Sequence, residues 1–195
     1  MAFKVPILNS SRTKLIAMVL IGVGLLVLGV AAWVFIPKPE AVPEYTIGRE
    51  YSAIPAEVDF PAPEISLTDL NNNPVSLNDY LGQVVLVNNW ATWCPPCTAE
   101  MPGLQAYYDL HQHQNFTIIA IEAGDPLAEV SDFVDRYGLT FPIWLDPEQD
   151  AINAFRNPSL PNSYVVDRDG VVRLAWVGAI SQEVLEEYVT PLLEE

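Results

Sequence analysis

Cys94 and Cys97 are the residues of this chain whose type and spacing best suit chemistry, and they are its only cysteines. They follow Val84–Val87, an apolar run typical of a strand buried on both faces, and precede a helical stretch that reaches about His113. At the start of a helix, unpaired N–H groups and the helix dipole stabilise a thiolate. A second cysteine one turn later can attack a mixed disulfide. The spacing therefore predicts an exposed nucleophile, Cys94, and a buried resolving thiol, Cys97.

Other uses of a cysteine pair remain open. A purely structural disulfide here would close a very short loop and contribute about 2 kcal/mol. Zinc would need two further ligands, and the only histidines, His111 and His113, are two residues apart and would point to different faces of a helix. A peroxiredoxin would place a threonine three positions before its reactive cysteine, whereas Thr92 is two before Cys94. A copper carrier would use both thiolates as soft ligands. No metal and no cofactor other than the redox disulfide is expected.

The residues between the cysteines indicate the direction of electron flow. Pro95 and Pro96 lack N–H groups that could stabilise a Cys94 thiolate, and no histidine adds positive charge. A less stabilised thiolate gives a less stable reduced form and a more reducing couple. The pattern predicts a reductant, with a thiol oxidase as the alternative.

Alternating strand and helix patterns surround the pair, which predicts an α/β layered sheet. Asp125 is the expected N-cap of a helix that starts at Pro126 and stops at Gly138, and Ser181 caps a final helix. Pro102 is expected to kink the helix after the cysteines. The other expected strands lie at 65–68, 75–77, 116–121, 141–145, 164–166 and 171–177, and the other helices at 148–155 and 182–193.

The N-terminal region reads as a membrane anchor. Residues 15–36 are uncharged and long enough to cross a bilayer, so they predict one transmembrane helix acting as an uncleaved signal anchor. Basic residues within 1–14 place that segment in the cytoplasm and the rest outside. A cleaved signal peptide is the alternative. Residues 37–59 form a Pro/Glu-rich linker, and the folded domain is expected over 60–195.

The net charge of −16 excludes nucleic acid as a partner, because such a surface repels phosphate backbones. The acidic surface serves either for solvation or for steering toward a basic partner.

The segment from Trp90 to Cys97, Trp-Ala-Thr-Trp-Cys-Pro-Pro-Cys, resembles the active-site segment of the thioredoxin superfamily. The whole stretch 60–195 is similar to the TlpA/ResA/CcmG-like branch of membrane-tethered, extracytoplasmic thioredoxins. The resemblance implies a thioredoxin-like fold, with a central mixed β-sheet flanked by helices and an extra helix and strand over Asp125–Leu145. It also implies a protein disulfide reductase.

The resemblance also implies roles for individual residues. Glu100 matches an acidic residue under the active site, where a carboxylate can take up and return the Cys97 proton. Pro161 matches the family's cis-proline facing the cysteines. Their alternatives are an exposed first-turn glutamate and an ordinary trans turn proline. Trp93 either lies beside the nucleophile or belongs to the core. The residues expected to contact the partner are Trp93, Pro95, Pro96 and Leu160.

Two departures from the family pattern bear on partner contacts. Asn89 stands where an aromatic residue is common, and Asn162-Ser163 follow Pro161 where Thr-Thr is common. The partners implied by the resemblance are thiol- or disulfide-bearing proteins outside the cytoplasm, in cytochrome c biogenesis or at the copper site of terminal oxidases. Electrons would come from an integral membrane thiol carrier. A single thioredoxin domain on a tether suggests a monomer.

Overall fold

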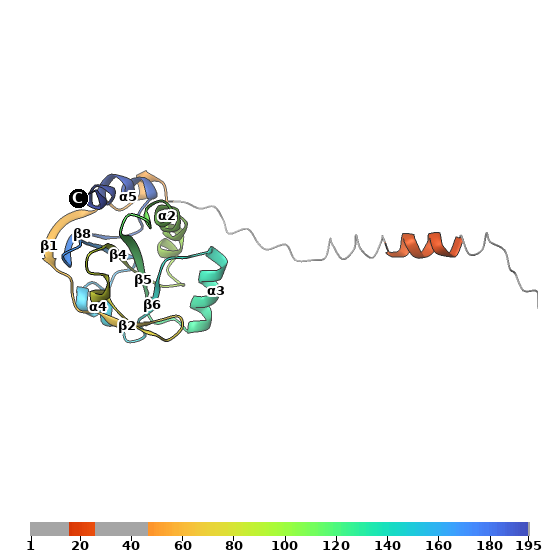
Figure 1. Ribbon diagram of the computed structural model, residues 1–195, viewed down its shortest axis with the longest axis horizontal. Helices are drawn as coiled ribbons and strands as arrows, with labels where there is room; N and C mark the ends of the chain where they lie inside the picture. The colour runs from red at the N-terminus through yellow and green to blue at the C-terminus, as the bar shows by residue number, and fades with distance from the viewer. Residues whose placement is uncertain (1–15, 26–46, 195) are drawn as a thin grey trace, which may run out of the picture. The chain divides into compact units, whose positions relative to one another are not determined.

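The computed structural model describes residues 16–25 and 47–194 (Figure 1). The chain divides into two units, Met1–Ala41 and Val42–Glu195. In the first, residues 16–25 form a helix. Across the described ranges, no helix is both long and apolar enough to cross a membrane. Most of the expected anchor (15–36), the expected cytoplasmic segment (1–14) and much of the expected linker lie outside these ranges.

The second unit is an α/β domain built on one mixed sheet with the strand order β1-β8-β7-β4-β5-β6-β2-β3. The strands are β1 (Ala56–Pro61), β2 (Ser66–Asp69), β3 (Pro74–Ser76), β4 (Val84–Trp90), β5 (Phe116–Glu122), β6 (Ile143–Leu145), β7 (Asn162–Val166) and β8 (Val171–Val177). The helices are α2 (Pro95–His111), α3 (Leu127–Tyr137), α4 (Asp150–Phe155), α5 (Gln182–Tyr188) and α6 (Thr190–Leu193), with 3-10 turns η1 (Arg49–Tyr51) and η2 (Leu77–Tyr80).

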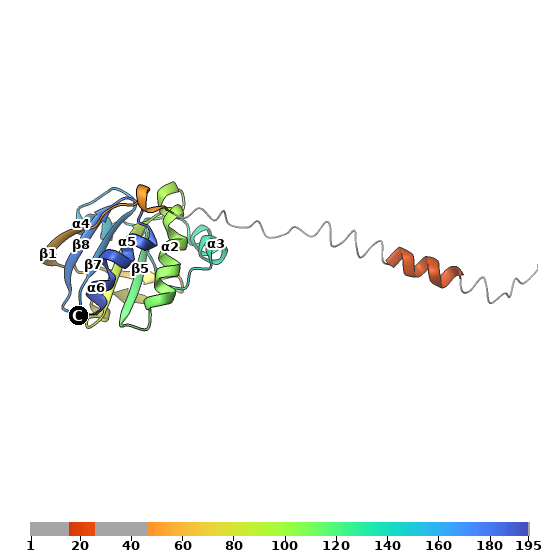
Figure 2. The same ribbon diagram turned by 90° about the horizontal axis from the view of Figure 1, so that it is seen from above.

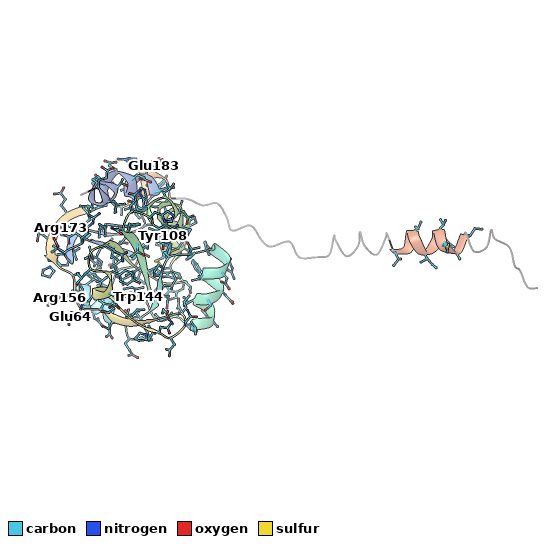
Figure 3. All side chains as sticks on the ribbon, viewed as in Figure 1. Glu64, Tyr108, Trp144, Arg156, Arg173 and Glu183 are labelled. Atoms are coloured by element: carbon cyan, nitrogen blue, oxygen red, sulfur yellow. A yellow bond between two sulfur atoms is a disulfide. The ribbon has the colours of Figure 1, made fainter. Side chains whose placement is uncertain are left out.

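The central strand β4 is buried at every position, as its apolar run predicts. It runs parallel to β5 and antiparallel to β7. Successive side chains alternate between the two faces of the sheet. Leu86 packs in a cluster with residues of α2, α3, α5 and α6. Val87 packs in a second cluster that includes Ala151 of α4 and Trp144, which is labelled in Figure 3. Figure 2 shows α2, α5 and α6 together on one side of the sheet.

Several local predictions are confirmed. The turn after β2 and the β7–β8 hairpin form where expected. Gly138 ends α3 in a left-handed conformation (φ 62°), which glycine adopts without steric cost. The Ser181 side chain accepts a hydrogen bond from Val184 N at 3.3 Å and so caps α5. Pro102 lies inside α2, which continues to His111, and the expected kink at Pro102 stays a prediction.

Three predictions about element ends are wrong. Asp125 does not cap α3: the N-cap is Pro126, without a side-chain hydrogen bond, because the Asp125 carboxylate binds elsewhere. The last helix divides into α5 and α6, with Pro191 in the first turn of α6. The ordered domain also begins before residue 60, since β1 starts at Ala56 and pairs with β8. That pairing links residues far apart in sequence.

Candidate functional site

Cys94 and Cys97 form a disulfide at the N-terminus of α2. β4 and the short turn after it place Cys94 at the N-cap of the helix, and Pro95 and Pro96 occupy its first positions. The exposed fraction of Cys94 is 4%, and that of Cys97 is 0%. Cys94 is therefore the more accessible cysteine of the two, but in the disulfide it is buried and not the exposed nucleophile that the sequence predicts.

The helix start offers Cys94 limited stabilisation. Cys97 N donates to the Cys94 sulfur at 3.4 Å. Pro95 and Pro96 occupy the two positions where other residues would present N–H groups, and proline has none to give. Cys97 N–H is thus the first backbone donor of α2 that can reach the sulfur.

Glu100 lies one turn after Cys97 and has an exposed fraction of 1%, so it is not an exposed first-turn glutamate. Its carboxylate accepts hydrogen bonds from Asn88 Nδ2 (2.8 Å) and Ile180 N (3.0 Å). Burial raises the pKa of Glu100 to about 8, against the lowering effect of both hydrogen bonds. A carboxyl group with this pKa can gain and lose a proton near neutral pH.

Asn88 is a site residue that sequence reasoning missed. Its Nδ2 binds Glu100 Oε1 and also Ser163 Oγ (2.9 Å), which joins β4, α2 and β7 beneath the cysteines. The available signal was a polar side chain within an otherwise apolar buried strand. A buried polar group needs a hydrogen-bond partner, and here the partner is the buried acid.

A pair of acidic residues lies under the turn before Cys94, and sequence reasoning missed this pair too. Asp125 Oδ2 accepts hydrogen bonds from Thr92 N (2.9 Å) and Thr92 Oγ1 (2.7 Å). Partial burial raises the pKa of Asp125, but hydrogen bonds with Thr92, Glu122 and Trp93 together outweigh it, so the net shift is downward. Nearby Glu122 accepts from Gly124 N and Asp125 N. Burial, together with Asp125, raises the pKa of Glu122 to about 7.

The residues expected to contact a partner lie before and between the two cysteines, except Leu160, which is distant in sequence. Trp93 has an exposed fraction of 67%, so it is not a core residue, and Pro95 and Pro96 are also exposed. Leu160 is half-buried, and the Leu160–Pro161 peptide bond is cis. Pro161 directly precedes β7, whose first residue pairs with the end of β4. The sheet therefore brings Pro161 to the same end as the turn that carries Cys94.

The histidines lie at the other end of α2. His111 Nε2 is 3.1 Å from both carboxylate oxygens of Glu186, and His113 follows the helix in a turn. Within residues 16–25 and 47–194, no group of three or more His, Cys, Asp or Glu side chains could hold a metal ion.

Comparison with known proteins agrees with this geometry. Residues 58–175 match the AhpC/TSA family. The chain is 37% identical over 128 residues to thiol-disulfide oxidoreductase ResA of Geobacillus kaustophilus, covering 66% of this chain and 74% of the relative. The same protein of Bacillus anthracis matches with the same identity and coverage.

Solved structures give the same result. A thiol:disulfide interchange protein of the thioredoxin family from Chlorobium tepidum aligns with a TM-score of 0.63 and 27% identity, over 71% of this chain and 99% of that one. StoA from Bacillus subtilis aligns with a TM-score of 0.58 and 26% identity, over 67% and 98% of the two chains. The fold is thioredoxin-like, and α3 and β6 supply the extra helix and strand expected over Asp125–Leu145.

Proposed function

The chain belongs to the AhpC/TSA family of thioredoxin-like proteins and is a thiol–disulfide oxidoreductase, and from that premise we propose that it reduces disulfides of partner proteins outside the cytoplasm. The observation that supports this direction of electron flow is the pair Pro95-Pro96 at the start of α2. Because neither residue has an N–H to offer the Cys94 sulfur, the thiolate gains less from the helix start. A weakly stabilised thiolate corresponds to a reducing couple.

The proposed reaction is a two-electron exchange. The Cys94 thiolate attacks a sulfur of the partner disulfide, and one partner thiolate leaves. The Cys97 thiol then gives its proton to the Glu100 carboxylate and attacks Cys94 in the mixed disulfide, which releases the second partner thiolate. The partner gains two electrons and takes up two protons, one of them returned through Glu100. The enzyme is left with the Cys94–Cys97 disulfide.

The position and the pKa of Glu100 support this proposed role. The residue is buried one turn from Cys97 on the same helix, and its pKa of about 8 is close to that of an ordinary thiol. Proton transfer between groups of similar pKa is nearly balanced in both directions. Trp93, Pro95, Pro96, Leu160 and Pro161 are proposed to form the surface that a partner covers.

The oxidised enzyme must be re-reduced, and we propose an integral membrane thiol carrier as the electron donor. The apolar run 15–36 would anchor the chain as a single-pass protein beside such a donor. The domain, which includes β1 from Ala56 onward, would lie outside the cytoplasm as a monomer on a Pro-rich tether that is shorter than the expected 37–59. The proposed partners are cysteine pairs of apocytochrome c or of an oxidase copper site. The support is the similarity to ResA proteins.

The reduction potential of the intact protein tests the direction. We expect a value below roughly −220 mV, nearer to thioredoxin than to the strongly oxidising periplasmic enzyme at about −120 mV. The same sample should reduce a peptide closed by a Cys-x-x-Cys disulfide. A potential near the oxidising end would refute the reductive assignment and indicate a thiol oxidase.

A further inference from the structure

Asn89 and Asn162 face each other across strands β4 and β7. Both are fully buried, and Asn89 Nδ2 donates to Asn162 Oδ1 at 2.8 Å. Neighbouring residues Asn88 and Ser163 point to the opposite face, toward Glu100. The asparagine pair is therefore separate from the hydrogen-bond network that holds the buried acid.

Asn162 also holds the loop that leads to Pro161. Its Nδ2 donates to the carbonyl oxygens of Ser159 (2.6 Å) and Asn157 (3.3 Å). In the described part of the chain, no backbone N–H donates to either carbonyl. Pro158 and Ser159 are exposed and belong to no helix or strand. The buried Asn162 side chain thus holds the middle of this loop, while backbone hydrogen bonds from Asn157 N to Ile152 O and from Gly178 N to Pro161 O hold its ends.

Asn89 links that loop to the element that delivers the nucleophile. It is the next-to-last residue of β4, five residues before Cys94. Its Nδ2 fixes the Asn162 amide in the orientation that directs Nδ2 of Asn162 to the loop carbonyls, because Oδ1 must then face Asn89. The position of the middle of the loop relative to Cys94 consequently depends on a contact between two adjacent strands.

We propose that Asn89 and Asn162 are positioning residues that set the loop 157–161 against Cys94 and thereby select which polypeptide disulfides the enzyme accepts. A polypeptide partner must cover the surface that flanks the reacting sulfurs, so it senses where the loop lies. A small disulfide needs access to Cys94 alone. The proposal deepens the proposed function and rests on exchange at Cys94 and Cys97, but it does not depend on the direction of electron flow.

The Asn89→Leu variant tests the proposal in the full-length chain. Leucine has the same branching at Cγ, and it removes the donor to Asn162 together with Asn89 Oδ1, a buried atom without a hydrogen-bond partner. The matched control is Ser159→Ala, which removes an exposed hydroxyl but keeps the carbonyl that Asn162 binds. The two probes are a peptide closed by a Cys-x-x-Cys disulfide and glutathione disulfide.

We expect Asn89→Leu to raise KM for the peptide about tenfold, which is the effect of losing one hydrogen bond, with kcat unchanged. Its rate with glutathione disulfide and its reduction potential should equal those of the wild type, and Ser159→Ala should match the wild type with both probes. Asn162→Thr, which cannot reach both loop carbonyls, should show the same difference between probes even if the leucine variant does not fold.

Equal losses with both probes, or a changed potential, would overturn the proposal, because the pair would then support the whole site. An unchanged KM for the peptide in both variants would also overturn it. The wild-type reduction potential tests the direction of electron flow separately. If the reductive assignment fails, the comparison of the variants with the wild type on the two probes still tests the role of the asparagine pair.

Discussion

Asn88 and Asn89 are successive residues of β4, yet their side chains bond on opposite faces of the sheet. Asn88 binds the buried carboxylate of Glu100, and Asn89 binds Asn162, which holds the loop before Pro161. The alternation of side chains along a strand makes this division possible. One strand therefore supports both the acid below the cysteines and the loop beside them.

Replacing Glu100 with glutamine should change how stability depends on pH. The pKa of Glu100 is about 8 in the folded protein and 4.5 for the free side chain, so the folded state binds more protons between these values. Its contribution to stability is present below about pH 4.5 and is lost as pH rises toward 8, at a cost on the order of 4 kcal/mol. Glu100→Gln cannot ionise, so its free energy of unfolding should fall less between pH 5 and 9.

Denaturant unfolding of the oxidised protein at several pH values measures this difference. Asn88 Oδ1, which is buried without a hydrogen-bond partner, could accept from the new amide after rotation of the Asn88 side chain. Glu122→Gln is the control. Because the pKa of Glu122 is about 7, its contribution to the pH dependence of stability should level off about one pH unit below that of Glu100. Identical pH curves for Glu100→Gln and wild type would contradict the assignment.

Thr92→Val should destabilise the turn before Cys94. The hydroxyl donates to the Asp125 carboxylate at 2.7 Å, and a hydrogen bond to a charged group contributes about 1.5 to 3 kcal/mol. We expect the free energy of unfolding at pH 7 to fall by an amount in that range. Thr92→Ser keeps the hydroxyl and should remain close to wild type. Equal stability of the two variants would show that the backbone N–H of Thr92 alone holds Asp125.

Changing Pro96 should make the couple more oxidising. Pro96→Ala restores an N–H in the first turn of α2, and Pro96→His adds positive charge as well, so each should stabilise the Cys94 thiolate more than the wild type does. We expect the potential of Pro96→His to rise by at least about 30 mV, a tenfold change in the equilibrium constant. Pro96→Ala should lie between. Equilibration with glutathione buffers measures the potentials, and unchanged values would refute the argument from missing N–H groups.

The Cys97→Ser variant should trap the mixed disulfide. Without a resolving thiol, a partner attacked by Cys94 stays attached, so a covalent adduct with a Cys-x-x-Cys peptide should accumulate and disappear on reduction. Cys94→Ser should form little adduct, because Cys97 is fully buried in the folded protein. Mass spectrometry without reductant detects the product. More adduct with Cys94→Ser than with Cys97→Ser would reverse the proposed roles.

The sequence by itself determined the local features of this protein. Two cysteines three positions apart, preceded by an apolar β-branched run and separated by two prolines, predicted a buried strand that leads into a helix with a redox pair at its start. The end of α3 at Gly138 and the Ser181 cap of α5 were also predicted from the sequence. Such signals work because turns, caps and buried strands depend on residues close together in the chain.

Only the tertiary structure decided what surrounds the pair. Glu100 bonds to Asn88, 12 positions away, and to Ile180, 80 positions away. Asn89 and Asn162 are 73 positions apart. Asp125, expected to cap a helix, instead accepts a hydrogen bond from Thr92, 33 positions away. These contacts depend on which strands are neighbours and in what register, and local patterns do not specify that. The burial that raises the pKa of Glu100 and the hydrogen bonds that hold the loop before Pro161 arise only when distant segments come together in the folded domain.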